Sequence, residues 1–271
     1  MEIALNATVV ILSVFYTLVV VAYARIFARG PVGVAAVVRP IFLITLAVHV
    51  VLIALRSAIL EACPLASQSD VLTLVAFSIG LIYLVLELRI GERSTGVFVV
   101  TPAFVLQFVA AVGALGSEPA RQTQMGINDS LHVFAAIIGL SSVLVCSVYG
   151  LLYISLYAGI KYGRFGLFYR KMPSLETLSE LNFVATWLAF LGLSGMLGFG
   201  ISSTWVEDTH FELWQPEVVL GVLLWTLYGL CLLAKHFLGM GGKRLAYSTA
   251  LGLLFAVGIL AFGFVGHTLP H

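Results

Sequence analysis

The chain of 271 residues is 61% hydrophobic and only 10% charged, with a mean hydropathy of +1.07. A soluble globular domain is about 45–50% apolar and about 25% charged, so this composition excludes a soluble protein. The 14 basic and 13 acidic residues leave a net charge of +1, which provides no basic surface for nucleic acid and no acidic tail.

Eight apolar runs follow one another along the chain. About 20 apolar residues cross the hydrocarbon core of a bilayer as a helix, and charged or Gly/Pro-marked breaks divide the chain into runs of about this length. The predicted spans are Leu5–Phe27, Pro40–Leu60, Val71–Ile90, Val97–Leu115, His132–Ile160, Leu181–Ser203, Val218–Leu238 and Leu245–Gly266. The predicted fold class is an all-α polytopic membrane bundle of about eight transmembrane helices, forming a single integral membrane domain over residues 1–271.

The basic residues gather on one side of this predicted arrangement. Eight crossings place alternate loops on opposite sides, and 12 of the 14 basic residues fall on the same side. By the positive-inside rule that side is cytoplasmic, so both termini are expected to face outward from a bacterial-type inner (plasma) membrane. The 12 residues are Arg25, Arg29, Arg39, Arg89, Arg93, Lys161, Arg164, Arg170, Lys171, Lys235, Lys243 and Arg244. The two exceptions are Arg56 and Arg121.

Local patterns add detail before and within the sixth predicted span. The segment Lys161–Glu180 interleaves aromatic and basic residues, which is typical of a segment lying against anionic headgroups. Inside it, Thr177 and Glu180 have the spacing of a capping box and predict the start of the helix. Glycines within the span are expected to let a neighbouring helix approach closely. They are Gly192, Gly195, Gly198 and Gly200.

Cysteines and sequence motifs give no sign of common enzyme chemistry. Cys63, Cys146 and Cys231 contain no CxxC pair, and their odd number provides no disulfide framework, so they are interpreted as packing residues. Neither a P-loop, a GxSxG, an HExxH nor a dinucleotide fingerprint occurs in a suitable context. The sequence therefore offers no support for an ATPase, a hydrolase or a zinc protease.

Two histidines are predicted at the ends of different helices on the outer side of the membrane. His132 opens the fifth span, and His267 closes the eighth. Imidazole is a common axial ligand of haem iron, so two imidazoles from facing helix ends predict a haem, of non-covalent b type, at the outer surface. The competing interpretation of each residue is a wetted histidine at the membrane interface.

The other histidines are weaker candidates. His49 falls near the middle of the second span, where an ionisable residue is a functional candidate; it is either an alternative haem or proton-relay residue or a buried histidine that only donates a hydrogen bond. His236 and His210 are interpreted as interfacial and surface residues, and His271 as a terminal one.

Tryptophans and outer arginines complete the predicted site. Trp205 and Trp214 bracket an acidic outer loop, and Trp225 lies further into the seventh span. Indoles beside two imidazoles are suited to stack on a porphyrin, and its propionates are expected to meet Arg56 or Arg121. An interfacial aromatic belt explains any single tryptophan equally well.

With these residues the chain resembles the cytochrome c assembly proteins, the haem-handling CcsA/CcmC group, and especially its shorter HemX-like branch of eight-span proteins. The resemblance covers residues 130–267. The residues that carry it are Leu131-His132-Val133, Met172 to Leu178 with Leu181-Asn182, Trp214-Gln215-Pro216-Glu217, Leu224 to Tyr228, Gly239 to Arg244 and Gly266-His267. His49 also resembles a second-span histidine of the shorter branch.

The resemblance implies haem bound by His132 and His267 at the outer (periplasmic or extracellular) face, with Trp205 and Trp214 lining it. The expected function is to hold or deliver haem in cytochrome c biogenesis, with other biogenesis proteins or an apocytochrome as partners besides membrane lipid. One alternative is an electron-transfer membrane cytochrome in which His49 and one outer histidine hold haem and electrons pass to quinone. Another is a membrane assembly scaffold without haem.

Overall fold

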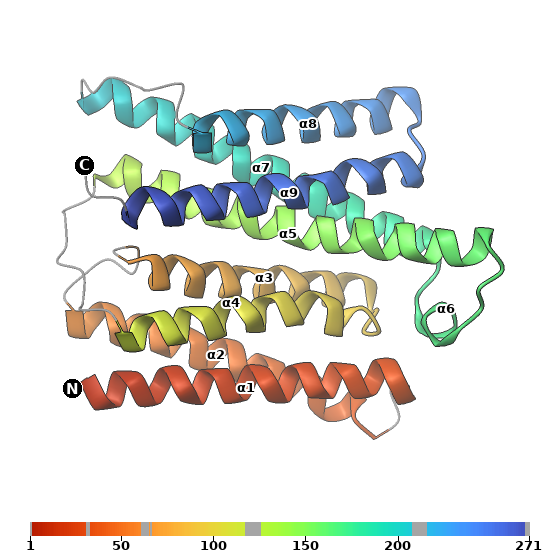
Figure 1. The fold of residues 1–271 in the computed structure, drawn as a ribbon, viewed down its shortest axis with the longest axis horizontal. Coiled ribbons are helices and arrows are strands. Elements are labelled where there is room, and N and C mark those ends of the chain that lie inside the picture. Colours follow the sequence, from red (N-terminus) through yellow and green to blue (C-terminus); the bar gives the residue numbers. More distant parts are fainter. Residues whose placement is uncertain are drawn as a thin grey trace. The chain divides into compact units, whose positions relative to one another are not determined.

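In the computed structural model the chain is helical, and the described residues contain no strand. The structure describes residues 2–30, 33–60, 65, 67–116, 126–207 and 216–268, without the side chains of 2–9, 35, 59–60, 114–116, 204–207, 217 and 260–268. The helices of this part are α1 (Glu2–Arg29), α2 (Ala35–Leu60), α3 (Gln68–Ile90), α4 (Gly96–Gly116), α5 (Ile127–Lys161), α6 (Leu167–Lys171), α7 (Leu175–Glu207), α8 (Pro216–Leu238) and α9 (Gly242–Thr268) (Figure 1).

Each of the eight predicted spans coincides with one long helix. Over the described residues, seven helices are long and apolar enough to cross a membrane, namely α1 to α5, α7 and α8. The chain is therefore an all-helical, multi-pass membrane protein. The eighth predicted span, Leu245–Gly266, lies within α9, and its crossing of the membrane stays a prediction.

The helices form two compact units. The first unit contains α1 to α4 with the short helix α6, and the second contains α5, α7, α8 and α9. The single domain over residues 1–271 stays a prediction. In the first unit, Arg25, Arg29, Arg39, Arg89 and Arg93 lie at or near helix ends; in the second, Lys161, Lys235, Lys243 and Arg244 do. We call this the basic end of each unit, and the other the opposite end.

Helix ends in the first unit follow local sequence signals. Ser67 caps α3: its hydroxyl accepts a hydrogen bond from the Asp70 amide at 3.1 Å, and the Asp70 carboxylate accepts from the Ser67 amide at 3.1 Å. This reciprocal pair satisfies two amides that the helix cannot bond itself. At the other end Gly91 takes a left-handed conformation with φ of 80°, which glycine adopts without a steric penalty. Strong caps therefore set the length of α3.

In the second unit, α7 begins earlier than its predicted cap. The Ser174 hydroxyl accepts a hydrogen bond from the Thr177 amide at 3.1 Å, and α7 starts at Leu175. The capping-box prediction at Thr177 and Glu180 placed the helix start three residues too late. Ser174 can cap the helix in place of Thr177 because its short side chain reaches the free amides of the first turn.

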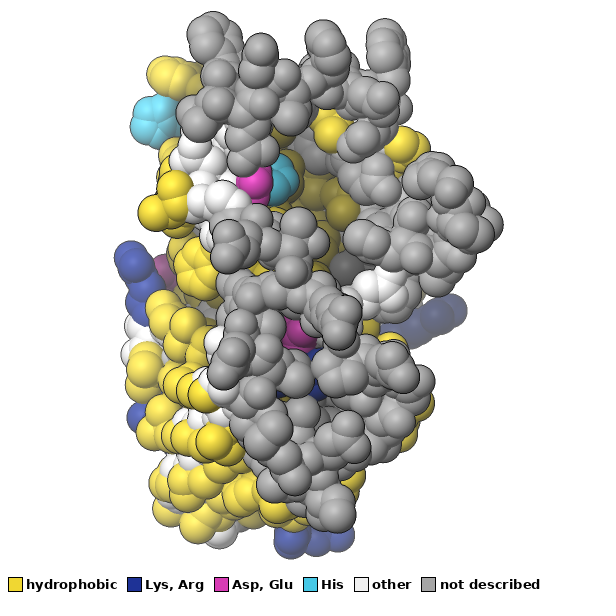
Figure 2. Space-filling view, turned by 90° about the vertical axis from the view of Figure 1, so that its left-hand side faces the viewer, with side chains coloured by type: hydrophobic (Ala, Val, Ile, Leu, Met, Phe, Trp, Pro, Cys, Tyr) yellow, Lys and Arg dark blue, Asp and Glu magenta, His cyan; other side chains and the backbone are white. Residues whose placement is uncertain are grey.

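Both units present apolar side chains on their outer surfaces, as expected of helices that face lipid. Figure 2 shows hydrophobic side chains gathered along one side of the described helices. In α8 and α9, for example, Leu230 is 60% exposed and Leu254 69% exposed. Because lipid chains are as apolar as these residues, the exposed surface carries no penalty in a bilayer, and specificity has to come from buried polar groups and close packing.

Candidate functional site

His132 is seated against α7 at the opposite end of the second unit. Its Nδ1 lies 2.7 Å from the backbone carbonyl oxygen of Met196. A carbonyl can only accept, so Nδ1 carries a hydrogen, and in the neutral form of the ring Nε2 keeps its lone pair. Metal-ligating histidines are oriented in this way, by donating the second ring N–H to a carbonyl. The ring of His132 is therefore held in the tautomer that can bind a metal through Nε2.

The space for this ring comes from Gly200. A Cβ atom at Gly200 would lie 2.8 Å from Nδ1 of His132, which is closer than non-bonded atoms approach. Only glycine leaves room for the imidazole at this height on α7. Sequence analysis assigned Gly200 to helix packing, and the structure adds that the group packed against it is the candidate ligand.

The backbone of α9 reaches the same end of the unit as His132. The Ser147 hydroxyl of α5 donates to the Thr249 carbonyl of α9 at 2.7 Å, which aligns the two antiparallel helices. From this contact His132 is 15 residues back along α5 and His267 is 18 residues forward along α9, or about 22 and 27 Å at 1.5 Å per residue. The predicted placement of both histidines at one end follows from this register. The His267 side chain is outside the described residues.

Trp225 of α8 packs against a different face of α7 from the one that His132 of α5 contacts. Its Nε1 donates to the Ser194 hydroxyl at 2.8 Å, and its ring stacks on Phe190 at a centroid distance of 5.6 Å. His132 instead contacts Met196 and Gly200, and at 100° per residue these two pairs of α7 residues are directed about 120° apart. The indole N–H and one ring face of Trp225 are thus engaged with the α7–α8 packing.

Three other predicted residues are beyond what the structure describes. Trp214 and Arg121 lie outside the described residues, and Trp205 lies in α7 with its side chain outside them. Their predicted roles, stacking on haem for the tryptophans and binding a propionate for Arg121, stay predictions.

Arg56 is engaged by a carboxylate in the first unit. Its Nε forms an ion pair with Asp70, and the two side chains are only 16% and 6% exposed. The same carboxylate completes the cap of α3. The predicted role of Arg56 in meeting a propionate would require this pair to open.

We expect Arg56→Met to destabilise the first unit by about 3 kcal/mol, because a nearly buried Asp70 carboxylate would lose its partner. Hydrogen exchange of peptides from α3, measured in detergent, would report the loss. The double variant Arg56→Met with Asp70→Asn is expected to recover part of it, since no charge is then left unpaired. Equal exchange in the wild type and Arg56→Met would contradict the pairing.

His49 has the surroundings of a packed core histidine. It is fully buried in α2, with its Nδ1 3.1 Å from the Tyr16 hydroxyl and its ring 5.2 Å from that of Phe77 between centroids. Within the described part of the chain, its Nε2 has no hydrogen-bond partner. The Tyr16 contact at Nδ1 fits a buried, hydrogen-bonded histidine, and the unpartnered Nε2 fits a ligand or proton-relay residue, so both interpretations from the sequence stay open.

No protein-family model and no curated protein matches this chain. The likeness to cytochrome c assembly proteins therefore rests on the quoted residues alone. Among the described residues no cluster of three or more His, Cys, Asp or Glu is arranged to hold a metal ion. A haem iron held by two histidines would need only two such side chains.

A buried carboxylate in the first unit was missed by the sequence reasoning. Glu87 of α3 has a fully buried side chain whose Oε1 lies 3.2 Å from nitrogens of both Arg39 and Arg93, while the Tyr23 hydroxyl donates to Oε2. The signal was present, because Glu87 interrupts the predicted span Val71–Ile90 and acidic residues within spans are rare. Four chain segments meet at this carboxylate, which makes it the polar anchor of the basic end.

A second missed feature is a hydrogen-bonded polar core in the second unit. Asn182 donates through Nδ2 to the Thr249 hydroxyl at 3.0 Å, and the Cys146 thiol lies 3.3 Å from the Tyr228 hydroxyl. All four side chains are buried. Such contacts between helices hold a membrane bundle in one register, because an unpaired polar group in hydrocarbon is costly.

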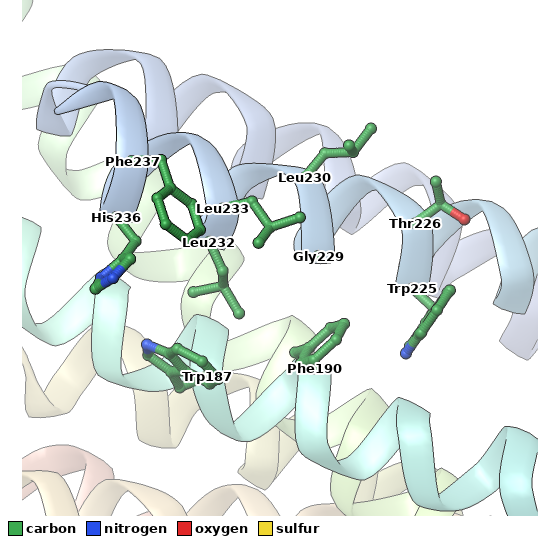
Figure 3. Close-up of a pocket in the computed structure, with 10 residues that line it drawn as sticks. All are labelled: Trp187, Phe190, Trp225, Thr226, Gly229, Leu230, Leu232, Leu233, His236 and Phe237. Atoms are coloured by element: carbon green, nitrogen blue, oxygen red, sulfur yellow. The ribbon is translucent and has the colours of Figure 1, made fainter.

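A groove of about 410 Å³ runs between α7 and α8 (Figure 3). Trp187, Phe190 and Trp225 form a row of aromatic rings along it, and His236 and Phe237 lie at its end towards the basic end of the unit. Gly229 leaves room in α8, since a Cβ there would meet the Phe190 ring at 3.0 Å. From the sequence, His236 was interpreted as an interfacial residue, and only the packing of α7 against α8 brings it into one groove with Trp187.

Proposed function

We propose that this chain is a haem-binding integral membrane protein of cytochrome c biogenesis that holds or delivers haem at the outer membrane face. The proposal includes eight spans with both termini outward in a bacterial-type inner membrane, following the distribution of basic residues. Its partners are haem and other biogenesis proteins or an apocytochrome.

The observation that supports haem is the seat of His132. A histidine that is only solvated at the membrane interface needs no fixed tautomer, whereas a haem ligand needs a free Nε2 and a fixed ring orientation. The Nδ1 hydrogen bond to Met196 supplies both, and Gly200 gives the ring its space. When bound, haem would be held through its iron by His132, with His267 as the proposed second ligand. Two imidazoles leave no open position on iron, which suits a carrier better than an enzyme.

The test is the visible spectrum of the full chain purified in detergent after expression with added haem precursor. The wild type is expected to show a low-spin Soret band, and His132→Ala and His267→Ala are each expected to lose most of it. His271→Ala is the matched control, because it removes a terminal histidine to which no ligand role is assigned. An unchanged low-spin spectrum in both His132→Ala and His267→Ala would overturn the ligand assignment.

Gly200 provides a finer prediction. We expect Gly200→Ala to displace the His132 ring, because the added Cβ would lie 2.8 Å from Nδ1. The protein should still fold, but haem content should fall at least severalfold, or its spectrum should turn high-spin. Gly198→Ala, with nothing within 4 Å of the added Cβ, is the control. Identical spectra for the two variants would argue against a seat formed by Gly200.

A further inference from the structure

The groove between α7 and α8 is apolar along its length and polar at one end. Its walls near the middle of the helices are Phe190, Trp225 and aliphatic side chains of α8. His236 lies at the basic end, and in Figure 3 the indole nitrogen of Trp187 is turned towards it. Within the described residues, neither Trp187 nor His236 makes a hydrogen bond with its ring nitrogen. The groove therefore offers N–H groups at one end and mostly hydrocarbon contact beyond. Thr226 also lines this apolar part, with its hydroxyl donating to the Val222 carbonyl of its own helix.

The length of the groove follows from the spacing of its lining residues along α8. Trp225 and His236 are 11 residues apart on α8, or about 16 Å at 1.5 Å per residue. Lys235 places its Nζ 4.8 Å from the centroid of the Phe183 ring, so the polar end carries a basic side chain typical of a membrane interface. The groove thus runs from the interface about half-way across a bilayer core of about 30 Å, with Leu230 and Leu233 exposed along it.

We propose that this groove binds an isoprenoid quinone that enters from the bilayer. The quinone ring would lie between Trp187 and Phe237, with a carbonyl oxygen accepting a hydrogen bond from His236 or Trp187. The isoprenoid tail would follow Phe190 and Trp225 towards the middle of the membrane. The volume of about 410 Å³ is within the range of small-molecule sites. This site is on α7 and α8 alone and needs no haem at His132.

Quinone fits this groove better than the other amphiphiles of a membrane. A flat ring can stack on Trp187 and Phe237, whereas an acyl chain gains nothing from aromatic planes. Quinone carbonyls also accept hydrogen bonds without bringing charge, which suits two N–H donors at the edge of the hydrocarbon. A phospholipid would instead bring a charged phosphate. The basic side chain near the polar end, Lys235, is not among the residues that line the groove.

The test is equilibrium binding of decylubiquinone to the full chain in detergent, measured by quenching of tryptophan fluorescence. Saturable quenching is expected, and His236→Leu should weaken binding about fivefold to tenfold, the value of one hydrogen bond. His236→Gln, which keeps an N–H donor, should lose less. Thr226→Phe should weaken binding at least tenfold by filling the apolar part, while Leu254→Phe, on the lipid-facing surface of α9, should have no effect.

Several results would overturn the proposal. They are the absence of saturable quenching, equal affinity in Thr226→Phe and Leu254→Phe, and equal competition by a short-chain phosphatidylglycerol, which would identify a lipid site. A haemin titration whose Soret shift is lost in His236→Leu would identify a second haem site instead. The Soret band that tests His132 is read separately, so either proposal can fail alone. Size-exclusion profiles of the two His236 variants check folding, and both substitutions are at an exposed position.

Discussion

Gly192→Ala is expected to destabilise the second unit by about 2 to 3 kcal/mol. A Cβ at Gly192 would lie 2.5 Å from the backbone N and Cα of Gly139, so α5 and α7 would have to move apart. Backbone atoms cannot rotate away as a side chain can. The same separation would weaken the contact between Ala135 and Gly195 further along the two helices.

Unfolding of this unit can be followed by its own thiols. Cys146 and Cys231 are free and buried, so a thiol-reactive fluorophore labels them only when the unit opens. Labelling on heating, in a Cys63→Ser background, should begin at a lower temperature in Gly192→Ala. Gly198→Ala is the matched control on the same helix: nothing lies within 4 Å of its added Cβ, and alanine favours a helix over glycine by up to about 1 kcal/mol. Similar midpoints for the two alanine variants would contradict the close helix approach.

Glu87→Gln is expected to destabilise the first unit by about 3 kcal/mol. The amide would remove the one negative charge that Arg39 and Arg93 share, and the two guanidinium groups would then face each other without a carboxylate. Removing one member of a buried ion pair costs about 3–5 kcal/mol. The lower end applies here, because the arginine side chains are 33% and 25% exposed and can reach water.

Hydrogen exchange of peptides from α3 measures this loss locally. About 3 kcal/mol corresponds to roughly hundredfold faster exchange of the protected amides. Arg89→Gln, which removes one charge from an exposed position two residues along the same helix, should change exchange only slightly. If Arg89→Gln had the larger effect, the Glu87 cluster would not be the anchor of this end.

The helices were predictable from the sequence because the signal for each is local. A run of about 20 apolar residues specifies a membrane helix wherever it lies, and each predicted span lies within a single long helix. For these long helices the errors lie at helix ends, as at α7, where Ser174 and not Thr177 caps the first turn. There the choice is between two neighbouring side chains, and it depends on which one reaches a free amide. The short helix α6 was not predicted.

The candidate site was predictable only in part. Topology placed His132 at a helix end, but no local pattern shows that Met196 and Gly200, more than 60 residues later, shape its seat. Arg56 was expected to be available for a ligand, whereas its partner Asp70 comes from the next helix. His236 was interpreted as an interfacial residue, and the groove that it lines with Trp187 forms only through the packing of α7 on α8.

The division between the two sources of information has a physical origin. Composition, hydropathy and charge distribution determine that the chain is helical and crosses a membrane, because transfer into lipid acts on each segment separately. Which polar groups pair, which glycines admit a neighbour and where a groove opens depend on contacts between segments distant in the chain. In lipid the hydrophobic effect no longer selects these contacts, so the buried Glu87 cluster, the α5–α7 approach and the seat of His132 emerged only from the packed helices.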